Sequence, residues 1–157
     1  NVIVSILCAL SVLLIGLYEP EFYRNFIFLL WYAVLAFMMS MIRELIKDMQ
    51  DLDGDELSQC KTAPVVLGIP KTKKIVLLLI FLTSAYISYI IYENFYINGV
   101  INFWYLISLF LIPLAALFYL VFSAQEKKDF YYASIFSKLL MLGGISSIFL
   151  FWKYFLI

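Results

Sequence analysis

Five long apolar stretches, separated by short polar segments, constrain the fold of this chain most strongly. They cover about residues 1–18, 26–47, 75–92, 100–124 and 130–157. Each is close to the roughly 20 residues with which an α-helix crosses the hydrocarbon core of a bilayer. With 65% hydrophobic residues and a mean hydropathy of +0.98, the composition excludes an ordinary soluble domain. We therefore predict an all-α fold, a polytopic helical bundle of about five spans embedded in the lipid bilayer.

Proline and glycine residues modify two of these spans. Pro113 lies inside the fourth span, where a proline is tolerated if neighbours satisfy the freed carbonyl, and we expect a kink there. Gly143 and Gly144 lie in the middle of the fifth span, and small residues at such a place predict close helix packing.

The basic residues predict how the bundle is oriented. Eight of the eleven lie in or beside two loops: Arg43, Lys47, Lys61, Lys71, Lys73, Lys74, Lys127 and Lys128. The positive-inside rule places both loops in the cytoplasm. An acidic loop over residues 48–74 then faces the cytoplasm, the first span runs outward, and the last span ends outside. We expect the chain to reside in the inner membrane of a cell.

The acidic residues are concentrated at the end of the second span. Six of the eleven in the chain lie there: Glu44, Asp48, Asp51, Asp53, Asp55 and Glu56. Removing a carboxylate from water is costly unless it is paired or holds a cation. Three- and four-residue steps place Asp48, Asp51 and Asp55 on one helix face. Such oxygen ligands suit Mg²⁺, which typically binds through one or two carboxylates together with substrate phosphates.

Basic side chains accompany these acids. Arg43 and Lys47 precede Asp51 by two turns and one turn on the same face, and Lys61 follows in the next segment. Cations beside metal-binding acids are what a diphosphate requires, because they bind the phosphate oxygens that the metal leaves free. Arg43, Lys47 and Lys61 are therefore candidate diphosphate contacts.

Two other interpretations of the acidic segment were considered. It could be a solvated helix end with intrahelical ion pairs such as Glu44–Lys47, as is common on soluble helices. The D-x-D-x-D pattern that begins at Asp51 also matches the first ligands of a calcium-binding EF-hand loop. That loop requires a glycine and a bidentate acid where this chain has Glu56 and Thr62, so calcium is disfavoured.

The run from Arg43 to Gly68 resembles the second aspartate-rich motif of UbiA-type intramembrane prenyltransferases. It is closest to the branch that makes geranylgeranylglyceryl-phosphate ethers, whose pattern is R-E-x-x-K-D-x-x-D-x-x-G-D followed by K-T-x-P-x-x-x-G. The matching positions here are Arg43, Glu44, Lys47, Asp48, Asp51, Gly54, Asp55, Lys61, Thr62, Pro64 and Gly68.

The resemblance implies a single domain of nine transmembrane helices around a central cavity, of which residues 1–157 form the C-terminal part with the last five. It implies that Mg²⁺ and a prenyl diphosphate are held jointly with a first aspartate motif, which this chain lacks. Asp51 and Asp55 would be the best metal ligands, with Asp48 as a third catalytic acid. We accordingly expect four further spans and the first motif before Asn1. The prenyl group would pass to a hydrophobic acceptor of lipid or aromatic type.

Other functions remain open at this stage. An ion-coupled transporter or lipid carrier would need ionisable groups near mid-membrane, where Lys138 is the lone candidate. A CDP-alcohol phosphotransferase would need a D-G-x-x-A-R element, but Asp53 and Gly54 are followed by a different sequence. A non-catalytic membrane subunit is a further alternative. No nucleic-acid partner is expected.

Overall fold

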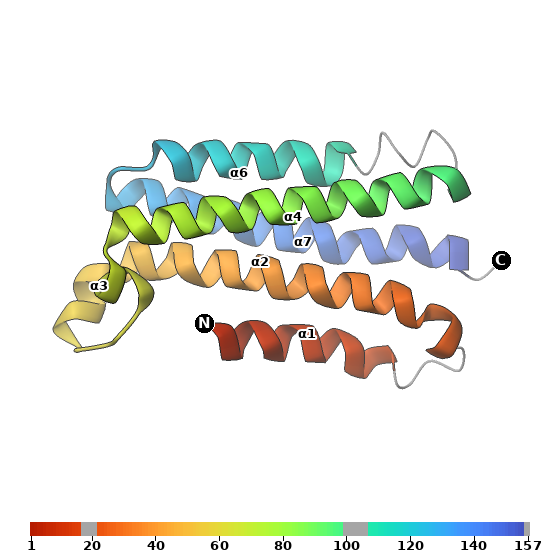
Figure 1. The fold of residues 1–157 in the computed structure, drawn as a ribbon, viewed down its shortest axis with the longest axis horizontal. Helices are drawn as coiled ribbons and strands as arrows, with labels where there is room; N and C mark the ends of the chain where they lie inside the picture. Colours follow the sequence, from red (N-terminus) through yellow and green to blue (C-terminus); the bar gives the residue numbers. More distant parts are fainter. Residues whose placement is uncertain (17–21, 99–106, 156–157) are drawn as a thin grey trace.

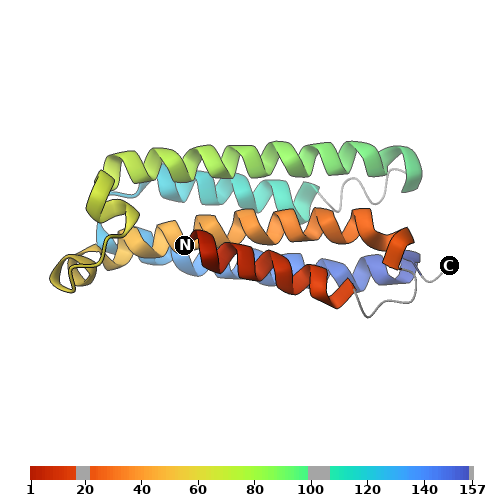
Figure 2. The same cartoon turned by 60° about the horizontal axis from the view of Figure 1, so that its bottom comes forward.

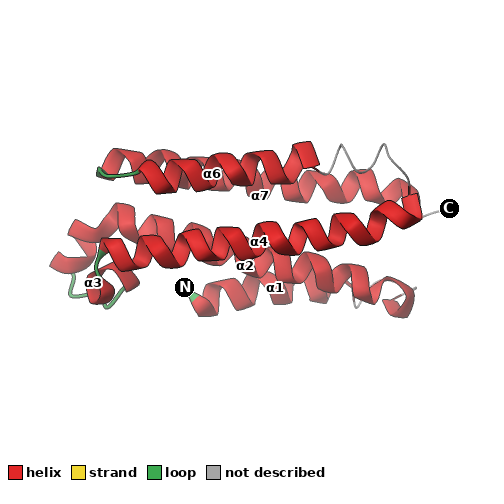
Figure 3. Ribbon diagram, turned by 45° about the horizontal axis from the view of Figure 1, so that its top comes forward, coloured by secondary structure: helices red, strands yellow, loops and turns green. Residues whose placement is uncertain are grey.

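In the computed structural model, residues 1–16, 22–98 and 107–155 are described, and within them every regular element is a helix (Figure 3). The elements are α1 (Val2–Gly16), α2 (Phe22–Leu57), α3 (Ala63–Leu67), α4 (Ile69–Asn98), η1 (Ile107–Leu111), α6 (Ile112–Ser123) and α7 (Lys127–Phe155). Within the described residues, the five predicted apolar stretches overlap α1, α2, α4, η1 with α6, and α7. Residues 17–18, 100–106 and 156–157 of these stretches lie outside the described part of the chain. The predicted all-α bundle is confirmed.

Four helices form the body of the molecule, and each packs against two neighbours. The α2 helix contacts α4 and α7, and α6 contacts the same two helices from the other side. Figure 2 shows α4 and α6 as one layer above α2 and α7. The α1 helix packs along the outside of α2 (Figure 1). The polar ends of the bundle therefore lie where α2 and α4, its two longest helices, begin and end.

Apolar side chains at helical spacing fill the space between these four helices. The residues that α2 contributes to the core cluster are Ile42, Leu45, Ile46 and Met49, which recur at intervals of three and four residues. That spacing places them on one face of a helix, which turns toward α4, α6 and α7. Matching buried residues on the partner helices include Val76, Ile80, Leu114, Leu117, Val121 and Phe130. The same period positions the acids of α2 on the remaining faces.

Two described helical segments are long and apolar enough to cross a bilayer, Leu29–Leu57 and Ile69–Glu93. Two shorter apolar helices, Val2–Leu14 and Ile107–Ser123, accompany them.

The structure shows the backbone before Pro113 and the surroundings of Gly143 and Gly144. The π-helical segment η1 ends at Leu111, directly before the Ile112–Pro113 pair that begins α6. Proline has no N–H group with which to continue the α-helical ladder, which accounts for the irregular turn before it. Gly143 and Gly144 face η1, and a Cβ atom added at these positions would lie 3.9 Å from Leu109 and 3.8 Å from Phe110. These are ordinary van der Waals distances that leave room for a methyl group, so the close approach expected from the sequence stays a prediction.

The connection between the second and third spans is shorter than the sequence suggested. The segment 48–74, predicted as a loop, is helical up to Leu57 and again from Ala63 to Leu67 and from Ile69 onward. Met49 lies among the acids and is on the buried face of α2, while the acids lie on the other faces, so the helix can continue through the acidic segment. The helix ends where Gln59 adopts a left-handed backbone conformation with φ of 54°. The acids are therefore carried by a helix and not by a loop.

Candidate active site

The C-terminal turns of α2 carry all three of the predicted catalytic acids. Asp48, Asp51 and Asp55 are each half-buried, and they lie at the end of the bundle where α3 and the start of α4 also lie (Figure 1). All three side chains are partly accessible, so their carboxylates are less costly to ionise here than in the apolar core. Within the described residues, no hydrogen bond or ion pair to the side chains of Asp51 and Asp55 is found.

Asp48 is the acid most closely tied to the rest of the structure. Its Oδ2 accepts a hydrogen bond of 2.6 Å from the Nδ2 of Asn1, at the start of α1. It also lies near the negative charges of Glu44 and Asp55. The contact joins residues 47 positions apart in the chain, and sequence reasoning missed it. The only signal was a polar residue at the beginning of an apolar span.

The three carboxylates do not converge on one point. No group of three or more metal-ligating side chains is found in the parts of the chain that the structure describes. The reason is geometric, because residues three and four positions apart on a helix have Cβ atoms about 5–6 Å apart and project in parallel. The acids have the chemistry that Mg²⁺ prefers, and their number and exposure fit a partial ligand set. Oxygen ligands from another segment would be needed to complete the site.

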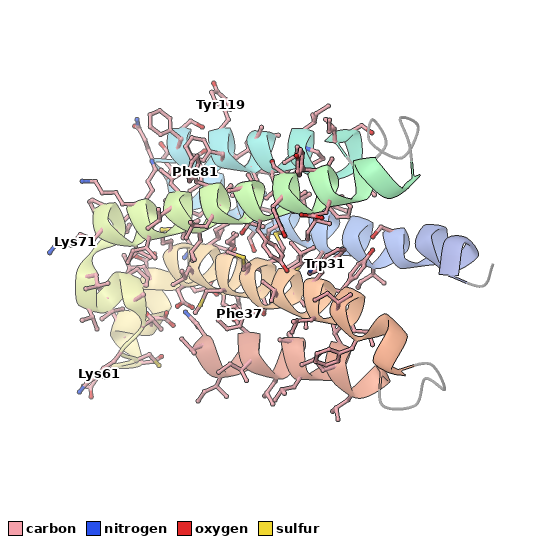
Figure 4. The ribbon with its side chains drawn as sticks, turned by 45° about the vertical axis from the view of Figure 1, so that its right-hand side comes forward. Trp31, Phe37, Lys61, Lys71, Phe81 and Tyr119 are labelled. Atoms are coloured by element: carbon pink, nitrogen blue, oxygen red, sulfur yellow. The ribbon has the colours of Figure 1, made fainter. Side chains whose placement is uncertain are left out.

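The predicted basic contacts differ in their surroundings. Arg43 is half-buried and its Nη1 forms an ion pair with Oε1 of Glu44, the next residue on α2. Lys47 is exposed one turn before Asp51. Lys61 is also exposed, and Figure 4 shows it at the same end of the bundle as Lys71, with both side chains pointing away from the helices. Lys61 does not fold back onto the acids here.

Thr62, in the segment between α2 and α3, matches the motif, but the sequence indicated no role for it. Its Oγ1 is buried and has no hydrogen-bond partner among the described residues. The residue occupies the N-cap position of α3, but its side chain makes no capping hydrogen bond. A buried hydroxyl without a partner costs about 1–3 kcal/mol, so this atom is available to a further polar group. Its position in K-T-x-P was the only sequence signal.

Asp53 and Lys127 form an ion pair that joins α2 to α7, with 3.3 Å between Oδ2 and Nζ. The side chains are 79% and 60% exposed, so the pair contributes little to stability. The sequence did not indicate this partner for Asp53, because the two residues lie far apart in the chain.

The turn between α6 and α7 is held by a more ordered set of hydrogen bonds. Lys73 on α4 donates from Nζ to the carbonyl oxygen of Ala124 at 2.7 Å. The Oδ2 of Asp129 accepts the backbone N–H groups of Gln125 at 2.8 Å and Glu126 at 3.0 Å. These two backbone donors, with a smaller effect from the charge of Lys73, hold the pKa of Asp129 below its ordinary value. These bonds hold the turn between α6 and α7 in place and tie it to α4.

Comparison with known proteins identifies the chain's relatives. The model of the UbiA prenyltransferase family matches residues 1–142. This chain belongs to the UbiA prenyltransferase family. The prediction made from the motif between Arg43 and Gly68 is therefore confirmed.

Three similar proteins all carry the name digeranylgeranylglyceryl phosphate synthase. The one from Methanosphaera stadtmanae is 30% identical over 144 residues, which is 90% of this chain and 50% of that protein. The one from Haloquadratum walsbyi is 32% identical over 46% of this chain and 24% of that protein. The one from Thermococcus sibiricus is 42% identical over 27% of this chain and 15% of that protein. No solved structure matches.

The UbiA-family chain described here spans about half the length of the Methanosphaera relative that it matches over most of its own length. Membership of this family, together with the apolar helices, makes it an integral membrane protein.

Proposed function

We propose that the complete protein transfers a prenyl group from a prenyl diphosphate to the hydroxyl group of a glyceryl phosphate lipid. The observation that carries this proposal is the long ordered match of residues 43–68 to the second aspartate-rich motif of the family, on the C-terminal part of α2 and the segment that follows it. The names of the relatives support the acceptor class, since a product with two geranylgeranyl groups forms when a second group is added to a glyceryl phosphate that already carries one.

The bonds that change are defined by this proposal. A C–O bond forms between the first carbon of the prenyl chain and the acceptor oxygen. The C–O bond to the diphosphate breaks, and the diphosphate leaves with the bonding electron pair. The hydroxyl proton passes to solvent or to a basic group near the acceptor. Charge accumulates on the departing diphosphate, so catalysis requires groups that stabilise this charge.

The residues of this chain would contribute to that stabilisation in two ways. Asp51 and Asp55, with Asp48, would hold Mg²⁺ together with the first aspartate motif, which we place in the part of the protein that this chain does not include. When bound, Mg²⁺ would neutralise negative charge on the diphosphate. Arg43, Lys47 and Lys61 would bind the remaining phosphate oxygens. The unpartnered hydroxyl of Thr62, next to Lys61, would add a neutral hydrogen-bond donor.

The apolar helices would surround the prenyl chain, and the charged helix ends would set the orientation of the protein in the membrane. A prenyl cation reacts with water, so the helices would exclude water from it. The basic residues within the segment 43–74 favour a cytoplasmic position for the acids under the positive-inside rule. We propose this orientation together with residence in the inner membrane.

An alanine substitution at Asp51 or Asp55 in the full-length protein tests the assignment. The expected result is a loss of Mg²⁺-dependent turnover of about 10²–10³-fold, the size seen when one charge-stabilising group is removed from an active site. Folding should be nearly unaffected because both side chains are partly accessible and neither belongs to the core cluster. Prenyl transfer is followed with radiolabelled prenyl diphosphate and a glyceryl phosphate ether acceptor.

Asp53→Ala is the matched control, since this acid lies on the same helix turns and its exposed ion pair with Lys127 contributes little. It should retain most of the turnover. Unchanged turnover of the Asp51 and Asp55 variants at limiting Mg²⁺ would show that these acids hold no metal. Equal binding of prenyl diphosphate in EDTA and in Mg²⁺ would favour a carrier over an enzyme, because like-charge repulsion should exclude the diphosphate without a divalent cation.

A further inference from the structure

The two faces of α4 differ sharply in their surroundings. One face is buried against α2 and α6 through Thr72, Val76, Ile80, Thr83 and Ile87. The opposite face is exposed along its length and begins with two lysines. We call this face the outer stripe of α4, and it comprises Lys71, Lys74, Ile75, Leu78, Phe81 and Leu82. These positions recur at three- and four-residue steps, so they lie on a single side of the helix.

The lysines of the outer stripe lack an anionic partner within the structure. No hydrogen bond or ion pair to Lys71 or Lys74 is found among the described residues, whereas Lys73 between them turns inward and bonds to Ala124. The first turn of α4 contains no acid. Positive side chains at a helix N-terminus are electrostatically unfavourable, since the helix dipole is positive there. An anionic group from outside the bundle would relieve this arrangement.

The order of residues along the outer stripe specifies what kind of anion fits it. Lys71 lies at the end of the bundle and points away from it, as Figure 4 shows. Phe81 follows about 15 Å along the helix axis at 1.5 Å per residue, which is about half of the hydrocarbon thickness. A charged head followed by a continuous exposed apolar face matches an amphiphile whose phosphate meets the lysines and whose acyl chain follows the helix. A soluble anion would bind only the lysines and would make no contact with the apolar residues of the outer stripe.

We propose that the outer stripe of α4 is a binding surface for anionic phospholipid of the surrounding leaflet, with Lys71 and Lys74 holding the headgroup phosphate. The charge complementarity of the two lysines selects anionic over zwitterionic headgroups. Ile75, Leu78 and Leu82 contact the first acyl chain. The inference depends on the membrane residence of the protein and not on prenyl transfer.

Native mass spectrometry of the full-length protein in neutral detergent tests the proposal with phosphatidylglycerol and phosphatidylcholine as probes. The wild-type protein should retain phosphatidylglycerol in preference to phosphatidylcholine. The double variant K71Q/K74Q should lose that preference, with the Kd for phosphatidylglycerol raised about fivefold for each lysine removed. K71R/K74R should restore it, since the charge is kept. Glycerol phosphate without acyl chains should not compete at the same concentration.

Lys138→Gln is the matched control, because Lys138 is an exposed lysine that lies several turns into α7. This variant should bind phosphatidylglycerol like the wild type. Equal retention of the two lipids by the wild type, or an unchanged Kd in K71Q/K74Q, would overturn the proposal. Competition by glycerol phosphate would also overturn it, since it would show a site for a soluble anion. The Asp51→Ala variant should lose turnover and keep the lipid preference, which separates this proposal from that of prenyl transfer.

Discussion

Lys73 should make a larger contribution to stability than any other lysine at this end of the bundle, and its replacement by methionine tests this. The substitution keeps most of the apolar stem and removes the ammonium group. In the structure this group donates to the carbonyl oxygen of Ala124 at 2.7 Å, and Ala124 itself is only 3% exposed. The carbonyl would therefore lose its donor in a place that water does not readily reach.

The magnitude follows from these surroundings. A hydrogen bond from a charged donor contributes about 1.5–3 kcal/mol, and a buried carbonyl left unpaired costs about 1–3 kcal/mol. Lys73 is half-buried, so solvent screening places the expected loss toward the lower end, about 1–2 kcal/mol. The loss should be measured as a change in the free energy of unfolding of the full-length protein in detergent free of anionic lipid.

The neighbouring residue provides the control. Lys74 is exposed and has no bonded partner among the described residues, so Lys74→Met should change the free energy of unfolding by less than about 0.5 kcal/mol. Lys73→Arg should recover part of the stability, because arginine can still donate to the carbonyl. Equal effects of the methionine substitutions at positions 73 and 74 would refute the reasoning, since only the first removes an interhelical bond.

Three further outcomes are expected. The backbone N–H groups of Gln125 and Glu126 donate to Asp129 and lower the pKa of its carboxyl group. The ionised carboxylate therefore stabilises the fold above its unfolded pKa of about 3.9, and this stabilisation is lost as the pH falls through the folded pKa. Asp129→Asn should remove this part of the acid dependence in thermal melts. Gly143→Ala should be tolerated, since the added Cβ would lie 3.9 Å from Leu109. Gly68→Ala should lower the free energy of unfolding by about 1–2 kcal/mol, since Gly68 has a φ of 82°. Chemical unfolding measures both changes, and a larger loss for Gly143→Ala than for Gly68→Ala would contradict the backbone argument. Cys60 is exposed between α2 and α3 and should react with a membrane-impermeant maleimide only from the cytoplasmic side, and labelling from the opposite side would reverse the proposed orientation.

The sequence by itself determined the helical class, the family and the residues of the candidate site. The apolar stretches carry more hydrophobic surface than a soluble domain would expose. The three- and four-residue spacing of Ile42, Leu45, Ile46 and Met49 already defines the buried face of α2. The motif from Arg43 to Gly68 identified the UbiA family before any geometry was known. These features are local, so they can be read from neighbouring residues in the chain.

Tertiary structure alone decided which polar groups meet. Asn1 reaches Asp48, Lys73 reaches Ala124, and Lys127 reaches Asp53, although the members of each pair are 47, 51 and 74 positions apart. Such contacts depend on how helices pack, and no spacing rule within one helix can specify them. The same limit explains why the aspartates of α2 share a helix face without converging. A single helix presents its side chains in parallel, and only a second segment facing it can bring their oxygens to one point.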